Sequence, residues 1–185
     1  MKGAVVKMLL AFAPFLVFAV AHRFFGSEIS LATGAAVALS VLLWDVIVKH
    51  AAKILDVGTT VLFSGLALYA FVAHPAWPVI AVRLCVDSGL LLIVLVSILA
   101  GKPFTLQYAR EQVAPEFWNS PVFRRTNFVI SWAWAAAFAV MVVTELALLY
   151  LPNLPQRAGM AVIIVALIAA VKFTGWYPEH LKNRS

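Results

Sequence analysis

Long apolar runs separated by short polar or proline-containing turns dominate the sequence. Six of these runs approach the roughly 20 apolar residues that a helix needs to cross the hydrocarbon core of a bilayer. They cover residues 4–24, 30–48, 57–73, 79–100, 127–151 and 159–176. None alternates with the two-residue period of a barrel strand. The pattern predicts an all-α protein, a polytopic bundle of six transmembrane helices that forms one membrane domain over residues 1–185.

Glycine and proline residues mark the breaks between these runs. Gly26, Pro75, Gly101 and Pro152 all fall between predicted spans, where they favour turns. Pro14 lies inside the first run, and its ring blocks one backbone hydrogen bond, so we expect a local kink there. The small residues at 34–36 and 64–65 predict close contacts between helices.

Composition supports a membrane protein and excludes several other classes. Hydrophobic residues make up 64% of the 185 residues and charged residues only 12%, whereas soluble domains have roughly 45–50% and about 25%. An ordinary soluble enzyme or a disordered chain does not have this composition. The only cysteine is Cys85, so an internal disulfide or a cysteine-based zinc site is excluded.

The distribution of Lys and Arg predicts the orientation of the chain. With six spans, both termini lie on the same side of the membrane. Eleven of the 14 Lys and Arg residues fall on that side, and only Arg23, Arg83 and Arg157 fall on the other. Because cytoplasmic loops carry the excess of positive charge, we expect both termini to be cytoplasmic.

The longest connection, residues 101–126, is predicted to be cytoplasmic and mixes aromatic with basic residues. Two helical turns are expected from Phe104 to Val113, before Pro115. Such a segment is suited to lying flat in the interface, with its rings in the acyl boundary and its cations toward anionic headgroups. It equally suits docking of a partner protein, and an active-site loop is a third interpretation. The candidate contact residues are Lys102, Arg110, Trp118, Arg124 and Arg125.

Charged residues within the apolar runs form a candidate intramembrane polar cluster. Arg83 and Asp87 are spaced i, i+4 on the fourth span and therefore share one helical face. Glu145 lies on the fifth span, at a similar depth in the outer half of the predicted topology. Because intramembrane charges are costly, pairing is expected. The cluster is a structural salt bridge that sets helix packing, part of a route for a solute or a proton, or, as a third interpretation, a catalytic site.

A second polar group lies at the predicted inner boundary. Asp45 and Lys49 end the second span, and Lys53 and Asp56 lead into the third. Since a short turn joins these spans, the four residues are expected to form ion pairs. At that depth they are typical of an ordinary hydrated interface.

The sequence predicts no cofactor, no metal and no catalytic residue. His22 and His74 fall at one predicted depth, and His50 and His180 at the other, as a bis-histidine haem requires. All four lie at helix ends or in loops, however, and no pair has an i, i+4 spacing. Phosphate-binding, dinucleotide-binding and nucleophile-elbow motifs are absent from the sequence.

A series of short motifs runs along nearly the whole chain. In order, they are Phe12, Pro14 and Phe15; Lys49 and Lys53; Gly58 with Leu62 and Phe63; Gly101 to Phe104 with Gln107; Trp118; Asn127, Trp132 and Trp134; and Leu154 to Gln156. This order resembles the bacterial intracellular septation protein A family of small inner-membrane proteins. The resemblance implies a location in the bacterial inner membrane and a role in envelope maintenance or cell division through protein contacts, without established catalysis.

We therefore interpret the chain as a multi-pass inner-membrane interaction or scaffold protein, and we do not expect enzymatic activity. The expected partners are the bilayer, anionic lipids at its cytoplasmic face, and other membrane proteins or a second copy of the chain. Nucleic acid is not an expected partner. The alternatives are a small transporter or channel that uses Arg83, Asp87 and Glu145, and an accessory subunit of a larger membrane complex.

Overall fold

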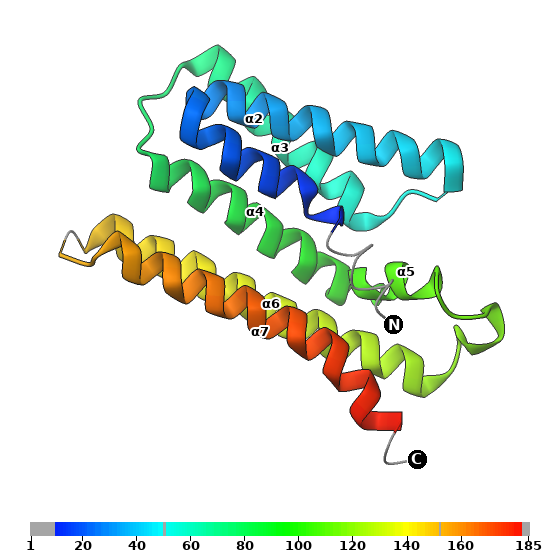
Figure 1. Cartoon of the computed structure of the whole chain (residues 1–185). Helices are drawn as coiled ribbons and strands as arrows, with labels where there is room; N and C mark the ends of the chain where they lie inside the picture. The colour runs from blue at the N-terminus through cyan, green and yellow to red at the C-terminus, as the bar shows by residue number, and fades with distance from the viewer. Residues whose placement is uncertain (1–9, 50, 152, 183–185) are drawn as a thin grey trace. The chain divides into compact units, whose positions relative to one another are not determined.

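The computed structural model describes residues 10–49, 51–151 and 153–182. Over these residues the chain is helical and contains no strand (Figure 1). The elements are α2 (Ala13–Lys49), α3 (Ile54–Ala73), α4 (Val79–Leu99), α5 (Phe104–Arg110), the 3-10 turn η1 (Pro115–Phe117), α6 (Pro121–Tyr150) and α7 (Gln156–Lys182). Five of them, α2, α3, α4, α6 and α7, are long and apolar enough to cross a membrane. The protein is a helical, multi-pass membrane protein.

The described residues fall into two compact units, and each is considered by itself. One unit contains residues 10–93, which include α2, α3 and most of α4. The other contains residues 94–182, which include the end of α4, then α5, η1, α6 and α7. In the first unit α2 packs on α3, and in the second α6 packs on both α5 and α7.

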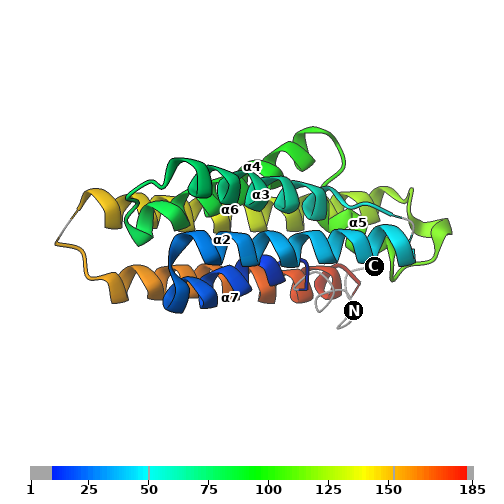
Figure 2. The ribbon, with the colours of Figure 1, turned by 90° about the horizontal axis from the view of Figure 1, so that it is seen from above.

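The long helix α2 folds back on itself at Gly26. This residue has φ 76° and ψ −176°, a conformation that is essentially restricted to glycine. The two legs of α2 lie side by side in both Figure 1 and Figure 2. Residues eight apart on a continuous helix are separated by about 12 Å along its axis, yet His22 Nδ1 lies 3.0 Å from Ser30 Oγ. The turn expected near Gly26 is therefore a true reversal of the chain.

Phe63 of α3 is the centre of the core in residues 10–93. Its ring contacts Phe15 and Phe18 on the first leg of α2, with centroid separations of 5.1 and 5.7 Å. Gly34 on the second leg lies so close that a Cβ there would be 2.7 Å from the Phe63 ring. One aromatic side chain thus joins both legs of α2 to α3. The close contact predicted at residues 34–36 is confirmed, whereas a Cβ on Gly65 would meet no neighbour within 4 Å.

In residues 94–182, the buried ring of Trp134 connects α6 to α7. Its Nε1–H donates to Thr174 Oγ1 of α7 at 2.9 Å, and the Thr174 hydroxyl donates to the carbonyl of Ala170. The Trp134 ring also packs against Phe138, one turn further along α6, with a centroid separation of 5.5 Å. A hydrogen bond between side chains therefore supplements apolar packing, as is common where lipid weakens the drive to bury apolar groups.

One helix start differs from the sequence prediction. The fifth run was expected to begin at residue 127, but α6 begins at Pro121, because hydropathy marks where the chain becomes apolar rather than where the helix starts. Proline is well suited to a first turn, since its missing N–H has no partner there. Pro14 also lies in a first turn, that of α2, and the turn at Phe12 separates α2 from the helical residues 10 and 11, so the local kink expected near Pro14 is present.

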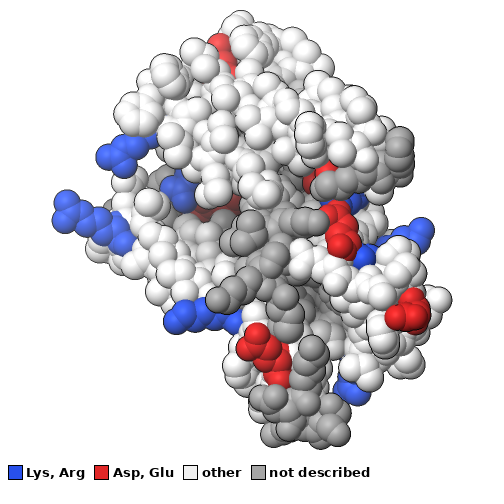
Figure 3. Space-filling view, turned by 45° about the vertical axis from the view of Figure 1, so that its right-hand side comes forward, with Lys and Arg blue, Asp and Glu red and all other residues white. Residues whose placement is uncertain are grey.

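Large apolar side chains remain exposed along the spanning helices. Leu99 on α4 and Val72 on α3 are 82% and 76% exposed. Figure 3 shows one face of the molecule, on which uncharged residues cover most of the surface and charged side chains form small separate groups. Such a surface is typical of contact with lipid rather than with water.

Candidate functional site

The turn after α4 is a helix cap that determines where the next segment starts. Gly101 adopts φ 70°, and its N–H donates to the carbonyl of Ile98 at 3.0 Å. The N–H of Lys102 donates to the carbonyl of Ser97, also at 3.0 Å. These two bonds, with a left-handed glycine between them, form a Schellman motif. The cap ends α4 and directs the chain through Pro103 into α5.

Buried hydroxyl groups attach α5 to the helices on either side of it. Ser97 Oγ accepts the backbone N–H of Phe104 at 3.2 Å. The Thr105 hydroxyl donates to the carbonyl of Asn127 at 2.9 Å and lies 2.7 Å from Ser131 Oγ. Because a hydroxyl has one proton, Ser131 must be the donor in that second bond. The four polar residues of these contacts, Ser97, Thr105, Asn127 and Ser131, are all buried.

These four polar residues were not identified from the sequence. Ser97 lies in the fourth predicted run, and Asn127 and Ser131 lie in the fifth. Isolated serine or threonine on an apolar helix most often bonds to its own helix backbone, so they did not stand out. Only Thr105 could have been singled out from the sequence, because it lies among apolar residues of a segment that was expected to be amphipathic.

The short helix expected after Phe104 is present as α5, but its rings do not face lipid. Phe104 is completely buried and Tyr108 is 3% exposed, whereas a segment lying flat in the interface would leave both rings exposed on one side. The prediction of rings in the acyl boundary is wrong for these two residues. The reason is tertiary: the hydroxyl bonds of Ser97 and Thr105 hold α5 against protein.

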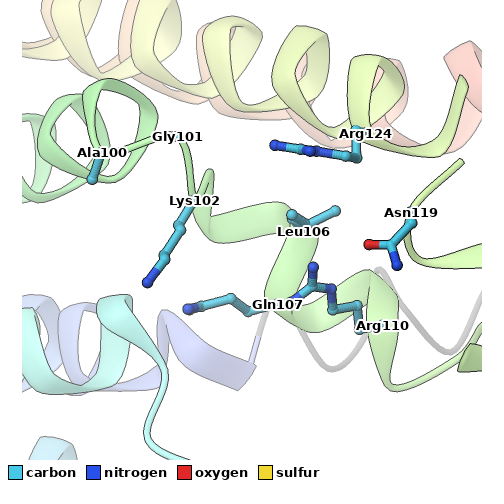
Figure 4. Close-up of a pocket in the computed structure, with 8 residues that line it drawn as sticks. All are labelled: Ala100, Gly101, Lys102, Leu106, Gln107, Arg110, Asn119 and Arg124. Atoms are coloured by element: carbon cyan, nitrogen blue, oxygen red, sulfur yellow. The ribbon is translucent and has the colours of Figure 1, made fainter. Parts of the chain in front are cut away.

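Three of the predicted contact residues share one pocket. Lys102, Arg110 and Arg124 line a cavity of about 380 Å³ together with Gln107 and Asn119. Figure 4 shows Lys102 and Gln107 extending toward each other, and Arg124 reaching over α5 from α6. The remaining lining residues are Ala100, Gly101 and Leu106. The described lining thus contains three cations, two amides and no carboxylate.

The other two predicted contact residues have different positions. Trp118 is half-buried, and the Arg110 guanidinium lies 5.4 Å from the centroid of its ring, in a cation–π arrangement. The Trp118 Nε1–H donates to the carbonyl of Val113 at 2.9 Å, which fixes the ring. Arg125 is exposed and does not line the pocket. Trp118 therefore supports Arg110, and Arg125 faces the surroundings.

The predicted ion pairs at the inner boundary are present, but they are buried. Lys53 forms a salt bridge with Asp45, and its Nζ lies 3.9 Å from Asp56 Oδ2. Lys53, Asp45 and Asp56 are 5%, 3% and 2% exposed, so the expectation of a hydrated interface is wrong for these three residues. The side chain of Lys49 lies outside the described residues. A cation between two carboxylates in a dry environment is a structural element that fixes the α2–α3 connection.

The intramembrane residues are distributed between the two units. Arg83 and Asp87 are partly buried on α4 in residues 10–93, and Arg83 lies close enough to His22 to interact with it electrostatically. Glu145 on α6 belongs to residues 94–182 and is 1% exposed. A common site for Arg83, Asp87 and Glu145 therefore stays a prediction.

Two histidines form contacts that were not expected from the sequence. His74 ends α3 and lies 2.8 Å from Glu28 Oε1 on the second leg of α2, in an exposed ion pair. His22 pairs with Ser30, as described above. Within the described part of the chain, no three His, Cys, Asp or Glu residues form a group able to hold a metal ion. His50 is outside that part.

Comparison with known proteins adds no relative. No family model, no curated protein and no solved structure matches this chain.

Proposed function

We propose that this protein is a non-catalytic interaction protein of the bacterial inner membrane that binds a membrane-protein partner through its segment 101–126. The proposal includes six membrane crossings and cytoplasmic termini. It also includes a role in envelope maintenance or cell division, as the resemblance to the septation protein A family implies. The observation that carries it is that this segment is folded and anchored, yet exposes apolar and basic side chains.

The exposed part of the segment lies next to its rigid part. Phe117, in the 3-10 turn, is 55% exposed, and Val122, in the first turn of α6, is 65% exposed. Arg125 is exposed on the following turn. Aromatic and arginine side chains held on a fixed backbone are typical of interface anchors, because little conformational entropy is lost when they are buried.

The reversal at Gly26 supports two crossings within α2. Its second leg, residues 27–49, is about 34 Å long at 1.5 Å per residue, enough for a hydrocarbon core of roughly 30 Å. With two crossings in α2 and one in each of α3, α4, α6 and α7, both termini fall on the same side. The excess of Lys and Arg on that side favours the cytoplasm.

The orientation is tested by cysteine labelling in inverted and right-side-out vesicles. In a Cys85→Ser background, Glu116→Cys should react with a membrane-impermeant maleimide only from the cytoplasmic side. Asn153→Cys, between α6 and α7, should react only from the opposite side. Labelling of both cysteines from one side would contradict the proposed topology.

The partner is tested by photo-crosslinking from position 117. A photoreactive phenylalanine analogue at Phe117 should give a discrete protein adduct in membranes, whereas the same analogue at the lipid-exposed Leu99 should not. Phe117→Ala with Arg125→Ala should remove the partner from the purified protein. Adducts to lipid alone at position 117 would overturn the proposed function.

Transport is the second candidate, and it is favoured by the burial of Glu145 within an apolar helix. Intramembrane carboxylates often mark proton or solute routes. Proteoliposomes would then show uptake that Glu145→Gln and Asp87→Asn each abolish. Equal uptake by the wild type and both variants would leave these carboxylates with a structural role only.

A further inference from the structure

The pocket between α5 and the start of α6 is strongly positive, although only eight residues line it. Lys102, Arg110 and Arg124 line it, and no carboxylate does. We propose that this pocket binds a phosphate group, supplied either by the headgroup of an anionic phospholipid or by a soluble phosphate.

The first argument is that no salt bridge within the described residues neutralises the positive charges of the pocket. Among the described residues, Lys102, Arg110 and Arg124 form no salt bridge. Three like charges around one cavity repel each other, and a bound anion converts that repulsion into attraction. In contrast, Lys53 of the same chain is placed between two carboxylates. The uncompensated cations are therefore a local property of the pocket.

The second argument is that the backbone of Lys102 and the guanidinium of Arg110 are held in place before any ligand binds. The Schellman cap at Gly101 fixes the backbone of Lys102. The ring of Trp118 holds the Arg110 guanidinium, and the buried Arg110 Nε meets no hydrogen-bond partner in the described part of the chain. Arg124 lies on the first turns of α6. Preorganised donors of this kind lower the entropy cost of binding an anion.

The third argument is the match between the lining and a phosphate ester. Arginine donates paired N–H groups to phosphate oxygens, and lysine adds a point charge. Asn119 supplies a neutral amide donor, and Leu106 and Ala100 supply an apolar wall. A volume of about 380 Å³ lies at the lower end of the range for small-ligand pockets, roughly 300–1,000 Å³. It accommodates a phosphate together with a glycerol-sized group.

The lipid source depends on the proposed function, because a headgroup reaches the pocket only if segment 101–126 lies at a membrane surface. The affinity for phosphate itself depends only on the pocket. Arg125 separates the two proposals, since it belongs to the proposed partner surface but not to the pocket. Arg125→Ala should lose partner binding but keep phosphate binding, whereas Arg124→Gln should lose phosphate binding but keep the partner. A failure of one proposal can therefore be told apart from a failure of the other.

The lipid experiment compares two neighbouring arginines of the full-length protein. Arg124→Gln and Arg125→Gln remove the same charge from exposed positions on the same helix, but only Arg124 lines the pocket. Native mass spectrometry in neutral detergent measures retention of added phosphatidylglycerol and phosphatidylcholine. We expect one tightly held phosphatidylglycerol in the wild type and in Arg125→Gln, and an affinity lower by about tenfold in Arg124→Gln. Lys102→Gln should behave like Arg124→Gln.

The second arm uses inorganic phosphate. The wild type is placed in nanodiscs of phosphatidylcholine alone, and phosphate binding is followed by ³¹P NMR line broadening. Broadening that Arg124→Gln removes and Arg125→Gln retains identifies a soluble phosphate as a ligand. Retention of phosphatidylglycerol without such broadening identifies the lipid headgroup. Equal losses in Arg124→Gln and Arg125→Gln, or no selective binding in either arm, would overturn the inference.

Discussion

The two groups of charged residues near cytoplasmic helix ends in the proposed topology differ in how their charges are balanced. In residues 10–93, Lys53 is buried between Asp45 and Asp56. In residues 94–182, Lys102, Arg110 and Arg124 line an open pocket without a carboxylate. In the first group the cation is paired with carboxylates inside the protein. In the second group no salt bridge among the described residues neutralises the cations, and in our proposal they bind an anion.

The largest expected effect is a difference in protein stability between a variant of the first group and a variant of the second. Lys53→Met should leave two carboxylates buried without their cation, and breaking a buried pair costs about 3–5 kcal/mol. Thermal unfolding in detergent should show a large decrease in midpoint. Lys102→Met removes the same charge from an exposed position and should change stability by less than about 0.5 kcal/mol. Similar losses in both variants would remove the distinction between the groups.

The next effect concerns the chain reversal at Gly26, which places the two legs of α2 side by side. Gly26→Ala places a side chain at φ 76°, ψ −176° and should destabilise the protein by about 1–3 kcal/mol. Gly65→Ala is the matched control, because that glycine lies within α3 and has open space around it. Its unfolding midpoint should stay the same or rise slightly. A Gly26→Ala protein as stable as the control would argue against the reversal.

An effect of similar size tests whether the pocket depends on the buried hydroxyl bonds. Thr105→Val preserves shape but removes the donor to Asn127 and the acceptor for Ser131, at a cost of about 1–3 kcal/mol. Phosphatidylglycerol retention should fall with it, because α5 carries Arg110 and Gln107. Thr33→Val, whose hydroxyl bonds only its own helix at Ile29, is the control and should change neither quantity. Unchanged lipid retention in Thr105→Val would separate the pocket from this anchor.

The smallest effect is expected at the exposed ion pair between Glu28 and His74. Glu28→Gln should alter stability by less than about 1 kcal/mol, because solvent screens a pair whose side chains are 42% and 68% exposed. Chemical unfolding of this variant beside Lys53→Met compares an exposed pair with a buried one in the same unit. A loss as large as that of Lys53→Met would show that burial does not decide the role of an ion pair in this protein.

Much of the helical framework was predictable because hydropathy, glycine and proline act locally. The runs that became α3 and α4 were correctly located, and Gly26 and Gly101 were correctly expected to mark turns. Asp45 was expected near Lys53 because a short connection keeps them close. The burial of that pair was not predictable, since sequence distance limits separation but does not reveal what covers a side chain.

The pocket was only partly predictable. Lys102, Arg110 and Arg124 were candidates because they lie in one polar connection, but their convergence depends on the Thr105 hydroxyl and on α6 starting at Pro121. Neither feature has a hydropathy signal. The separation of Arg124 from Arg125 in role is likewise invisible in the sequence, since it depends on the angle at which α6 begins.

The sequence by itself determined that the chain is helical and apolar enough to cross a membrane, and where turns such as those at Gly26 and Gly101 fall. Only the tertiary structure decided which charges are neutralised and which remain available. The physical reason is that membrane helices have apolar surfaces both toward lipid and toward each other. Hydropathy cannot distinguish these surfaces, and the few polar contacts that orient the helices join residues far apart in the chain.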